Sequence, residues 1–236
     1  MLKQLTVAAL FLILTALIAI PTAILLEQQP QGAAIHPTPE QNSALIAAAR
    51  RGDEAEVRRL LAAGASVTAT DESGRTALIA AAYGDHLAVA RLLIAAGADV
   101  NVQDQSQQSA YLIPTADGSV AMLRLTLAAG ADVRRTDSYN GTGLIRAADR
   151  GHVEVVRELL KTPIDVNHVN RLGWTALLEA VILGDGGANH TEVVRLLLAH
   201  SADVNIADKG GLTPLAHARQ RGQGEITALL VAAGAK

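Results

Sequence analysis

Histidine and carboxylate side chains are the groups in this sequence that could bind a metal or transfer protons. His86 and His152 occupy the same place in two copies of a recurring segment, and Asp99 and Asp132 do so at another place. Because an active site is needed at one unique place, residues copied at regular intervals indicate a structural role. We expect the two histidines to bond backbone groups at a turn between helices.

The chain also lacks the compact motifs that carry common enzyme chemistry. It contains no Gly-x-Ser-x-Gly elbow, no phosphate-binding loop, no His-Glu-x-x-His pair and no cysteine. Asp185, Asn189 and His190 lie close together, but in a glycine-rich stretch whose spacing fixes no ligand geometry. We therefore predict no enzymatic activity, no metal and no cofactor. The 20 basic and 23 acidic residues give a net charge of −3, and no basic stripe points to nucleic acid as a partner.

A short segment that recurs at a fixed interval sets the positions of these residues. Gly64, Gly97 and Gly130 each open a copy of the type Gly-Ala-Asp-Val-Asn, and successive copies are 33 residues apart. Related copies include Asp165 and Asp203, which are 38 residues apart. A period of this length predicts a stack of small units, each of which mainly contacts its neighbours.

Residues 71–103 form the clearest copy of the unit. Thr76 precedes an alanine-rich run and can cap its free N–H groups. A second apolar run with helical spacing starts at Leu87 and stops before Gly97, which suits a left-handed helix end. Neither helix is long enough to be stable alone in water. We therefore predict that the units stack and that alanine and leucine fill the core.

Two motifs recur in register along the chain. The first helices begin with Thr76-Ala77-Leu78, Thr142-Gly143-Leu144, Thr175-Ala176-Leu177 and Thr213-Pro214-Leu215. The second helices include Gly151-His152-Val153-Glu154-Val155-Val156 and the run from Thr191 to Leu198. This pattern resembles the ankyrin repeat family, in the form of an exported bacterial-type protein. The resemblance implies an all-α solenoid of stacked helix–turn–helix units with short β-hairpin-like turns, and a surface that binds another protein.

We divide the chain into three parts. Residues 1–27 are predicted to be a signal peptide or a transmembrane anchor, an N-terminal hydrophobic helix that precedes the repeats, and residues 28–39 a flexible linker. The repeat domain spans residues 40–236, with units at about 38–70, 71–103, 104–136, 137–169, 170–207 and 208–236.

The N-terminal segment predicts that the repeats lie outside the cytoplasm. Leu5 to Leu26 is uncharged, and as a helix these 22 residues would rise about 33 Å, against about 30 Å of hydrocarbon in a bilayer. Lys3 precedes the segment and the next basic residue is Arg50, so the positive-inside rule keeps the N-terminus in the cytoplasm. We expect a periplasmic protein. Removal of the leader after Ala23 would make it soluble, and retention would anchor it to the inner membrane.

Some copies depart from the pattern. Pro114 falls inside the first helix of the third unit, where it removes a backbone bond, so we expect this unit to be the weakest. Five extra residues within 183–190 predict a flexible loop in the fifth unit, which is either a tolerated insertion or a contact loop for a partner. Pro163 and Ser201 replace the helix-ending glycine, so we expect these ends to close differently from the end at Gly97.

Residues that vary between units while pointing the same way are the best candidates for partner binding. Interface hot spots favour Trp, Tyr and Arg, and we expect an exposed aromatic pair at the turn tips, formed by Tyr139 and by Trp174, the sole tryptophan. The predicted contact residues are Arg75, Tyr83, Tyr139, Arg150, Arg171, Leu172, Trp174 and Leu212.

The sequence thus favours a non-catalytic module that binds a protein partner on the concave face and turn tips of the stack. An alternative is an inhibitor or immunity protein that blocks a toxic enzyme of the cell envelope. We expect a monomer that contacts the membrane only through its N-terminal segment if this is not cleaved. The identity of the partner is not encoded in any recognisable motif.

Overall fold

The computed structural model describes residues 37–236. The predicted leader at 1–27 and most of the predicted linker at 28–39 lie outside the described residues. Among the helices of the described part, none combines the length and the apolar character needed to cross a bilayer.

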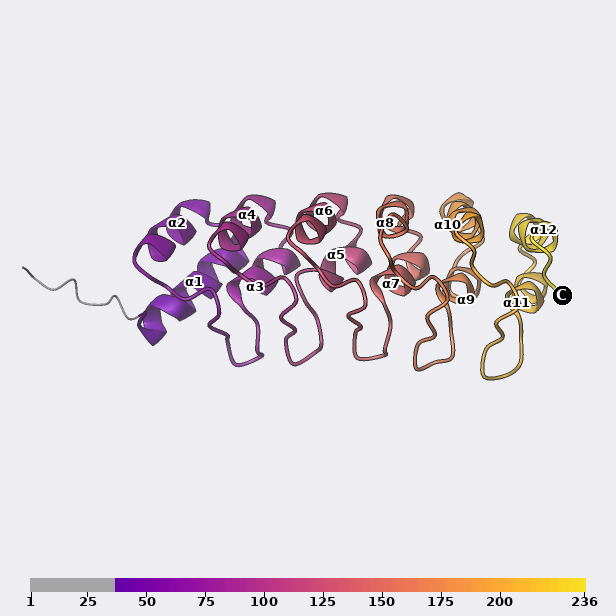
Figure 1. Ribbon diagram of the computed structural model, residues 1–236, viewed down its shortest axis with the longest axis horizontal. Coiled ribbons are helices and arrows are strands. Elements are labelled where there is room, and N and C mark those ends of the chain that lie inside the picture. The colour runs from indigo at the N-terminus through magenta and orange to yellow at the C-terminus, as the bar shows by residue number, and fades with distance from the viewer. Residues whose placement is uncertain (1–36) are drawn as a thin grey trace, which may run out of the picture. The chain divides into compact units, whose positions relative to one another are not determined.

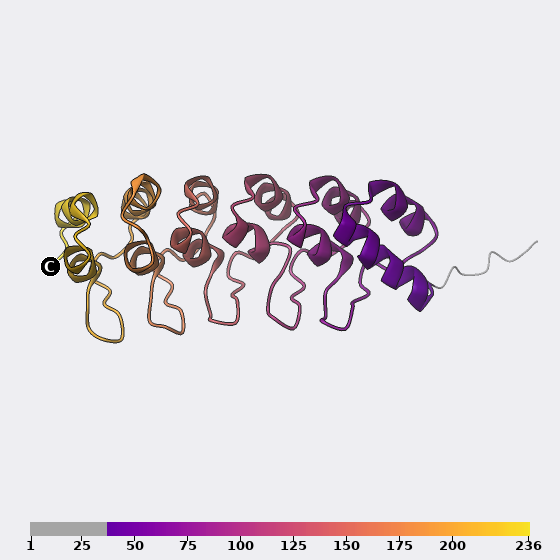
Figure 2. The same ribbon diagram turned by 180° about the vertical axis from the view of Figure 1, so that it is seen from behind.

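Residues 37–236 form helix pairs that repeat along one direction, with an inner and an outer row of helices (Figure 1). The inner helices are α1 (Pro39–Arg51), α3 (Ala77–Tyr83), α5 (Leu112–Asp117), α7 (Gly143–Asp149), α9 (Ala176–Ile182) and α11 (Pro214–Gln220). The outer helices are α2 (Glu54–Ala62), α4 (Leu87–Ala95), α6 (Val120–Ala128), α8 (Val153–Leu159), α10 (Ala188–Ala199) and α12 (Gly224–Ala232). The long turns between units all project on the side of the inner row, as the view from behind also shows (Figure 2).

The all-helical solenoid predicted from the sequence is confirmed, but the turns are not β-hairpins. Strands are absent from residues 37–236, where the turns contain only isolated bridges that join Thr70 to Thr76 and Thr136 to Thr142. The turns are instead closed by side chains, as described below. The predicted N-terminal hydrophobic helix falls outside the described residues.

Inner helices begin where a hydroxyl side chain caps them. The Thr76 Oγ1 accepts a bond from the Ile79 N–H at 3.3 Å, and Thr142, Thr175 and Thr213 act in the same way. Ser109 takes this place in the third unit and accepts from the Leu112 N–H at 3.1 Å. The recurring Thr of the sequence motif therefore satisfies one free donor at each helix start.

Histidines at the turn between the two helices of a unit join that unit to the one before it. The Nε2 atom of His86 bonds the Arg50 carbonyl at 3.1 Å, and that of His152 bonds the Ala116 carbonyl at 2.9 Å. His190 reaches the Asp149 carbonyl in the same way at 3.0 Å. The prediction that His86 and His152 bond backbone groups is confirmed, and each bond ties an outer helix to the inner helix of the unit before it.

Two apolar clusters of Ala, Leu, Val and Ile side chains form the core between the rows, and they meet in the third unit. Tyr111 and Leu112 belong to one cluster, whereas Ala110 and Ile113 belong to the other. Pro114 has no N–H, and α5 accordingly begins only at Leu112, whereas α3 begins at Ala77 and α7 at Gly143, right after their capping threonines. The third unit thus holds the shortest inner helix of the described chain.

The two unusual helix ends differ from each other. Ser201 adopts a left-handed φ of 64°, and the N–H groups of Ser201 and Ala202 bond Leu198 and Leu197 just as Gly97 and Ala98 bond Ile94 and Leu93. The expectation of a different closure is therefore wrong at Ser201. At Pro163, by contrast, no left-handed residue follows α8, and the chain turns through the Thr162 N–H bond to Leu159.

The insertion in the fifth unit is not a free loop. The helix α10 already begins at Ala188 and has 12 residues, so it takes up the last part of the insertion. Asp185 Oδ1 accepts the Gly187 N–H at 2.8 Å, and Arg221 donates to the Gly184 carbonyl at 3.1 Å. These bonds fasten both ends of the glycine-rich segment, contrary to the flexible loop expected from its composition.

Candidate partner-binding surface

The turn between units is closed by the side chain of its first residue. In the fourth unit, Asp137 Oδ1 accepts the N–H groups of Tyr139 and Gly141, both at 2.8 Å. Asp71, Asp104, Asn170 and Asp208 accept from the residues two and four positions later in the same way. In each of these five turns, this bonding leaves the second and third residues exposed at the tip.

A second contact links the turn to the inner helix that follows. The other oxygen of Asp137 pairs with Arg146 Nη1 at 3.0 Å, and the other oxygen of Asp208 bonds His217 Nε2 at 2.8 Å. In the fifth unit, Asn170 Nδ2 donates to Glu179 Oε1 at 2.7 Å. The partner is nine residues further on in each case. Polar groups of the turns and of the inner helices therefore meet on the face that carries the tips.

A hollow of about 200 Å³ lies on this face between the fourth and fifth units. We call it the α7–α9 hollow, and it is lined by Asp137, Tyr139, Gly141, Ile145, Arg146, Asp149, Asn170, Leu172, Glu179 and Leu183. A neighbouring hollow of about 320 Å³ shares Asp137, Tyr139, Arg146 and Asp149 and adds Arg150. Because they share four lining residues, the two hollows adjoin each other on the inner face.

Glu179 is the unusual group of the α7–α9 hollow. Its side chain lies on α9 and is 5% exposed. Burial raises the pKa of Glu179 to about 7, with a smaller contribution from the negative charge of Asp149, while the bond from Asn170 opposes the shift. The carboxyl group therefore changes its charge near neutral pH.

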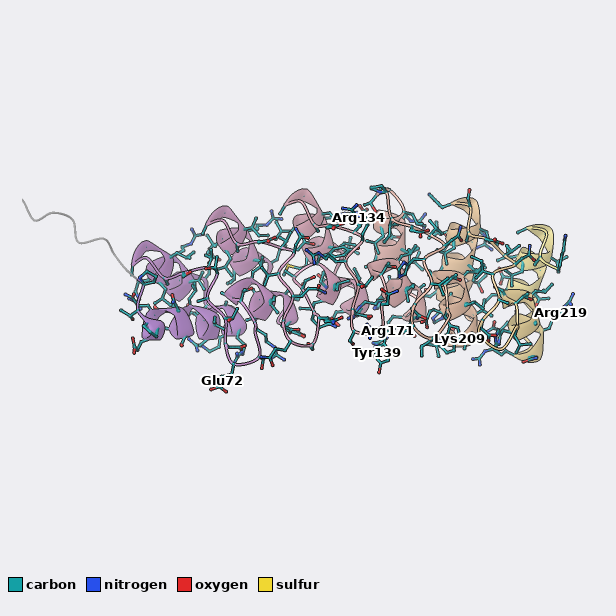
Figure 3. The ribbon with its side chains drawn as sticks, turned by 60° about the horizontal axis from the view of Figure 1, so that its bottom comes forward. Glu72, Arg134, Tyr139, Arg171, Lys209 and Arg219 are labelled. Atoms are coloured by element: carbon teal, nitrogen blue, oxygen red, sulfur yellow. The ribbon has the colours of Figure 1, made fainter. Side chains whose placement is uncertain are left out.

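The structure brings part of the predicted contact set to this place. Tyr139 and Leu172 line the α7–α9 hollow and Arg150 lines its neighbour. Arg171 donates its N–H to the Tyr139 carbonyl and its Nη1 to the Ser138 carbonyl, both at 2.8 Å. The tips that carry Tyr139 and Arg171 consequently lie side by side, with the Tyr139 side chain pointing outward (Figure 3).

Arg75 and Tyr83 form a separate group two units away. The Arg75 guanidinium lies 4.9 Å from the centre of the Tyr83 ring, which is a cation–π contact. Both side chains reach Asp104, at 3.5 Å from Arg75 Nε and 3.3 Å from the Tyr83 hydroxyl. The two side chains thus pack against each other and contact the next turn through Asp104.

Trp174 and Leu212 are not exposed, and the expected exposed aromatic pair is therefore wrong for Trp174. Both side chains are half-buried. Each lies four positions after the first residue of its turn, where its N–H bonds that residue, Asn170 for Trp174 and Asp208 for Leu212. This position is the base of the turn, not its tip. Whether either residue contacts a partner stays a prediction.

Glu179 and Arg146 were missed as site residues by reasoning from the sequence. One usable signal was present, because Ala80, Ile113, Arg146, Glu179 and His217 occupy the same position of successive units and vary in charge. A variable position on a repeated inner helix is a candidate for the binding face. Leu183 opens the insertion of the fifth unit, which was a candidate contact loop, and it lines the hollow.

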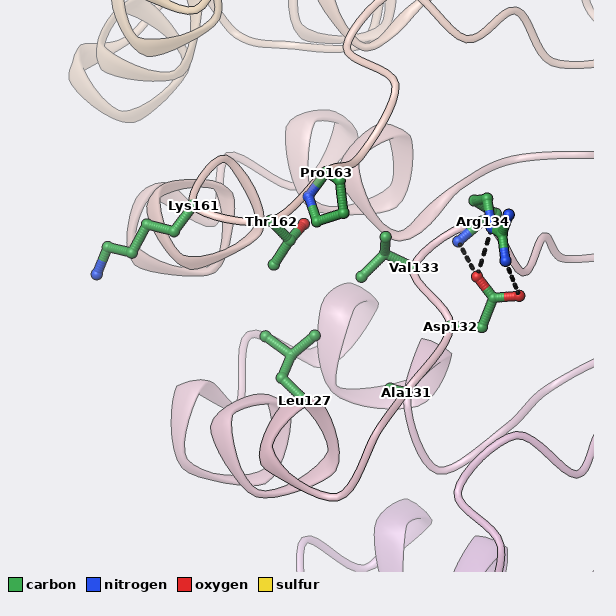
Figure 4. A pocket seen from close by; sticks show the side chains of 8 residues that line it. All are labelled: Leu127, Ala131, Asp132, Val133, Arg134, Lys161, Thr162 and Pro163. Atoms are coloured by element: carbon green, nitrogen blue, oxygen red, sulfur yellow. Dashed lines mark hydrogen bonds and ion pairs between the residues drawn. The ribbon is translucent and has the colours of Figure 1, made fainter.

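A roomier hollow of about 630 Å³ lies near the ends of α6 and α8. Its polar groups do not converge, because Arg134 is bound to its neighbour Asp132 at 2.9 Å and Lys161 points away from the other lining residues (Figure 4). Lys161 is also paired with Glu158 at 2.8 Å. Within residues 37–236 no group of three or more His, Asp or Glu side chains is arranged to hold a metal ion. We therefore regard the α7–α9 hollow as the candidate site.

The stacked helix pairs and side-chain-closed turns define a repeat solenoid whose turns project from one side, and comparisons with known proteins identify its family. A family model described as ankyrin repeats (3 copies) matches residues 14–104 and 113–208, and one described as ankyrin repeats (many copies) matches residues 187–231. The chain belongs to the ankyrin repeat family. Ankyrin repeats in general mediate protein–protein interactions and are typically non-catalytic.

Solved structures agree with this assignment. An ankyrin repeat domain from Acinetobacter baumannii AYE is 50% identical over 81% of this chain and 98% of that one, with a TM-score of 0.79. The ankyrin repeat protein EF0377 is 34% identical over 80% and 97% of the two chains, with a TM-score of 0.77. The ankyrin repeat domain of Bcl-3, a member of the IkappaB protein family, is 28% identical over 82% and 86%, with a TM-score of 0.72. No curated protein matches the chain.

Proposed function

We propose that the chain is a non-catalytic interaction module that docks a protein partner on its inner-helix face and turn tips, centred on the α7–α9 hollow. The observation that carries this proposal is the gathering of exposed apolar side chains around the hollow. Tyr139 is 61% exposed, Leu172 45% and Leu183 51%, and all three line it. Large apolar side chains that share one exposed place are typical of an interaction site.

The test compares two sets of variants in cross-linking and capture from cells that make the full chain. We expect a partner that is retained by the wild type to be lost from the Tyr139→Ala, Leu172→Ala double variant. Val231→Ala is the matched control, because Val231 is 50% exposed on the outer helix α12. Equal retention by the double variant and the control would contradict docking at this hollow.

The same capture distinguishes an interaction module from an inhibitor. An immunity protein would hold one toxic envelope enzyme at a fixed stoichiometry and abolish its activity, whereas an adaptor would leave the activity of its partner intact. Assay of the captured protein with and without the chain decides between the two.

We also propose that the apolar segment from Leu5 to Leu26 carries the repeats out of the cytoplasm or holds them at the membrane. The proposal is supported by the length and lack of charge of this segment and by the position of Lys3 before it. Cell fractionation and mass measurement of the mature N-terminus test it. A chain recovered entirely from the cytoplasm with an intact N-terminus would contradict it.

A further inference from the structure

We propose that the α7–α9 hollow receives a basic side chain, lysine or arginine, from the docked protein, with the Glu179 carboxylate as the main counter-charge. This inference rests on the proposed docking function and names the chemistry that the docked protein must bring. The argument comes from the charges in the hollow, their bonding and the apolar walls around them.

The cations at the hollow are already paired. Arg146 Nη1 lies 3.0 Å from Asp137 Oδ2, and Arg150 Nε lies 3.1 Å from Asp149 Oδ2. Each of these two cations thus has a carboxylate partner, whereas within residues 37–236 no cation pairs with Glu179, and the negative charges of Asp149 and Asp137 also act on it. The Glu179 Oε1 accepts a hydrogen bond from the neutral amide of Asn170.

The elements packed against α9 supply no cation either. On α11, His217 is bonded to Asp208, and the exposed Arg219 forms no ion pair with Glu179. Arg221, which follows α11, bonds the Gly184 carbonyl. On α10, His190 bonds Asp185 and the Asp149 carbonyl, while Arg195 pairs with Glu192. On α7, Asp149 adds a negative charge that acts on Glu179. A carboxylate that is 5% exposed and lacks a counter-ion is the group that a cation from outside would stabilise most.

The walls of the hollow suit the rest of such a side chain. Tyr139, Leu172 and Leu183 provide exposed apolar surface at its rim, against which the aliphatic stem of lysine or arginine can pack while its charged end points inward. A volume of about 200 Å³ is below the usual range for small-molecule sites, about 300–1,000 Å³. The hollow therefore fits one side chain of a larger partner, and an acidic side chain would be repelled by Glu179 and Asp149.

The experiment selects peptides from a random display library with the purified full chain in detergent, and measures their affinities by fluorescence anisotropy. We expect the selected peptides to lose binding to the Tyr139→Ala, Leu172→Ala variant and to contain an essential Lys or Arg. Replacement of that residue by norleucine or citrulline is expected to weaken binding to the wild type about tenfold or more. It should have little effect on binding to Glu179→Gln. Glu225→Gln is the matched control, because Glu225 is an exposed carboxylate on α12.

Each outcome decides one of the two proposals. Peptides that depend on Tyr139 and Leu172 but bind Glu179→Gln as well as the wild type, or that carry no basic residue, overturn the basic side chain and leave the docking surface standing. The docking surface itself is overturned if every peptide that the wild type retains is retained equally by the Tyr139→Ala, Leu172→Ala variant, or if the wild type retains none.

The pH dependence gives a readout that a purely structural role of Glu179 would not give. A basic side chain binds the ionised carboxylate, and the pKa of Glu179 in the folded chain without a bound peptide is about 7. Affinity should therefore rise about tenfold between pH 6 and pH 8 in the wild type and stay level in Glu179→Gln. An affinity that is flat or falls over this range in the wild type contradicts the inference.

Discussion

Gly143 and Tyr111 are a matched pair across two units, and replacing the glycine tests how tightly the units are fitted together. Tyr111 takes the place that Leu78 has in the second unit and is fully buried. Gly143 is the first residue of α7, where α3 and α9 have an alanine. A Cβ atom at position 143 would lie 2.7 Å from the Tyr111 hydroxyl oxygen and 2.9 Å from Thr115 Cγ2.

The expected effect of Gly143→Ala combines two opposing contributions. Overpacking of a rigid core costs about 1–3 kcal/mol, whereas the better helix propensity of alanine returns up to about 1 kcal/mol. We therefore expect a net loss of about 1–2 kcal/mol in the free energy of unfolding. In a Tyr111→Leu, Thr115→Ala background, which copies Leu78 and Ala82 of the second unit, both close contacts disappear. There the same substitution should be neutral or stabilising.

Urea unfolding of the four proteins in this cycle, followed by circular dichroism, measures the coupling. Gly224→Ala is a matched control, because Gly224 also begins a helix and a Cβ there would meet nothing within 4 Å. If Gly143→Ala costs no more than Gly224→Ala, or costs the same in both backgrounds, the fit of Tyr111 against Gly143 does not limit the packing of these units.

Three further predictions concern stability. Since the pKa of Glu179 is raised from 4.5 to about 7, the folded chain binds this proton more tightly than the unfolded chain. The free energy of unfolding should fall by on the order of 3 kcal/mol as the pH rises from 4.5 to 7, and urea titrations of Glu179→Gln should lack this fall. Asn170→Asp should cost about 1–3 kcal/mol at pH 8 because it removes a donor to a buried carboxylate. Adding Glu179→Arg, which copies the Asp137–Arg146 pair, should restore stability in the same assay. Among the internal units, hydrogen exchange should be fastest in the third unit of the chain, where Pro114 shortens α5; uniform protection across the internal units would contradict this.

The sequence predicted the repeated part of the fold because the repeat itself carries the information. A threonine that recurs before most of the alanine- or leucine-rich runs has one physical use there, the helix cap, and the structure shows that use at Thr76 and Thr142. The bridging role of His86 and His152 followed from the same logic. Such features depend on local geometry, which each copy of the unit reproduces.

The candidate site was predicted only in part, because it depends on where a turn residue points. Residues one and two positions after the first residue of a turn, such as Tyr139 and Leu172, are exposed, as expected. Residues four positions after it, such as Trp174 and Leu212, were placed at the tip but lie at its base. The repeat period could not separate these cases, because both positions vary between units. What separates them is the backbone pairing of the fourth residue, whose carbonyl accepts the N–H of the first turn residue, as Trp174 does from Asn170 and Leu212 from Asp208.

The contrast between Asp137 and Asn170 shows how the units differ on the face that carries the turn tips. In the second and third units the turn aspartates find donors in the unit before, Arg50 for Asp71 and Tyr83 for Asp104. For Asn170, the residue of the unit before that holds the place of Arg50 and Tyr83 is Asp149. Its negative charge already acts on Glu179. A second aspartate here would face carboxylates on both sides, whereas the amide of Asn170 closes the turn with its oxygen and donates its N–H to Glu179. The amide of Asn170 thus holds a buried carboxylate in place without a cation, as the proposed docking of a basic side chain requires.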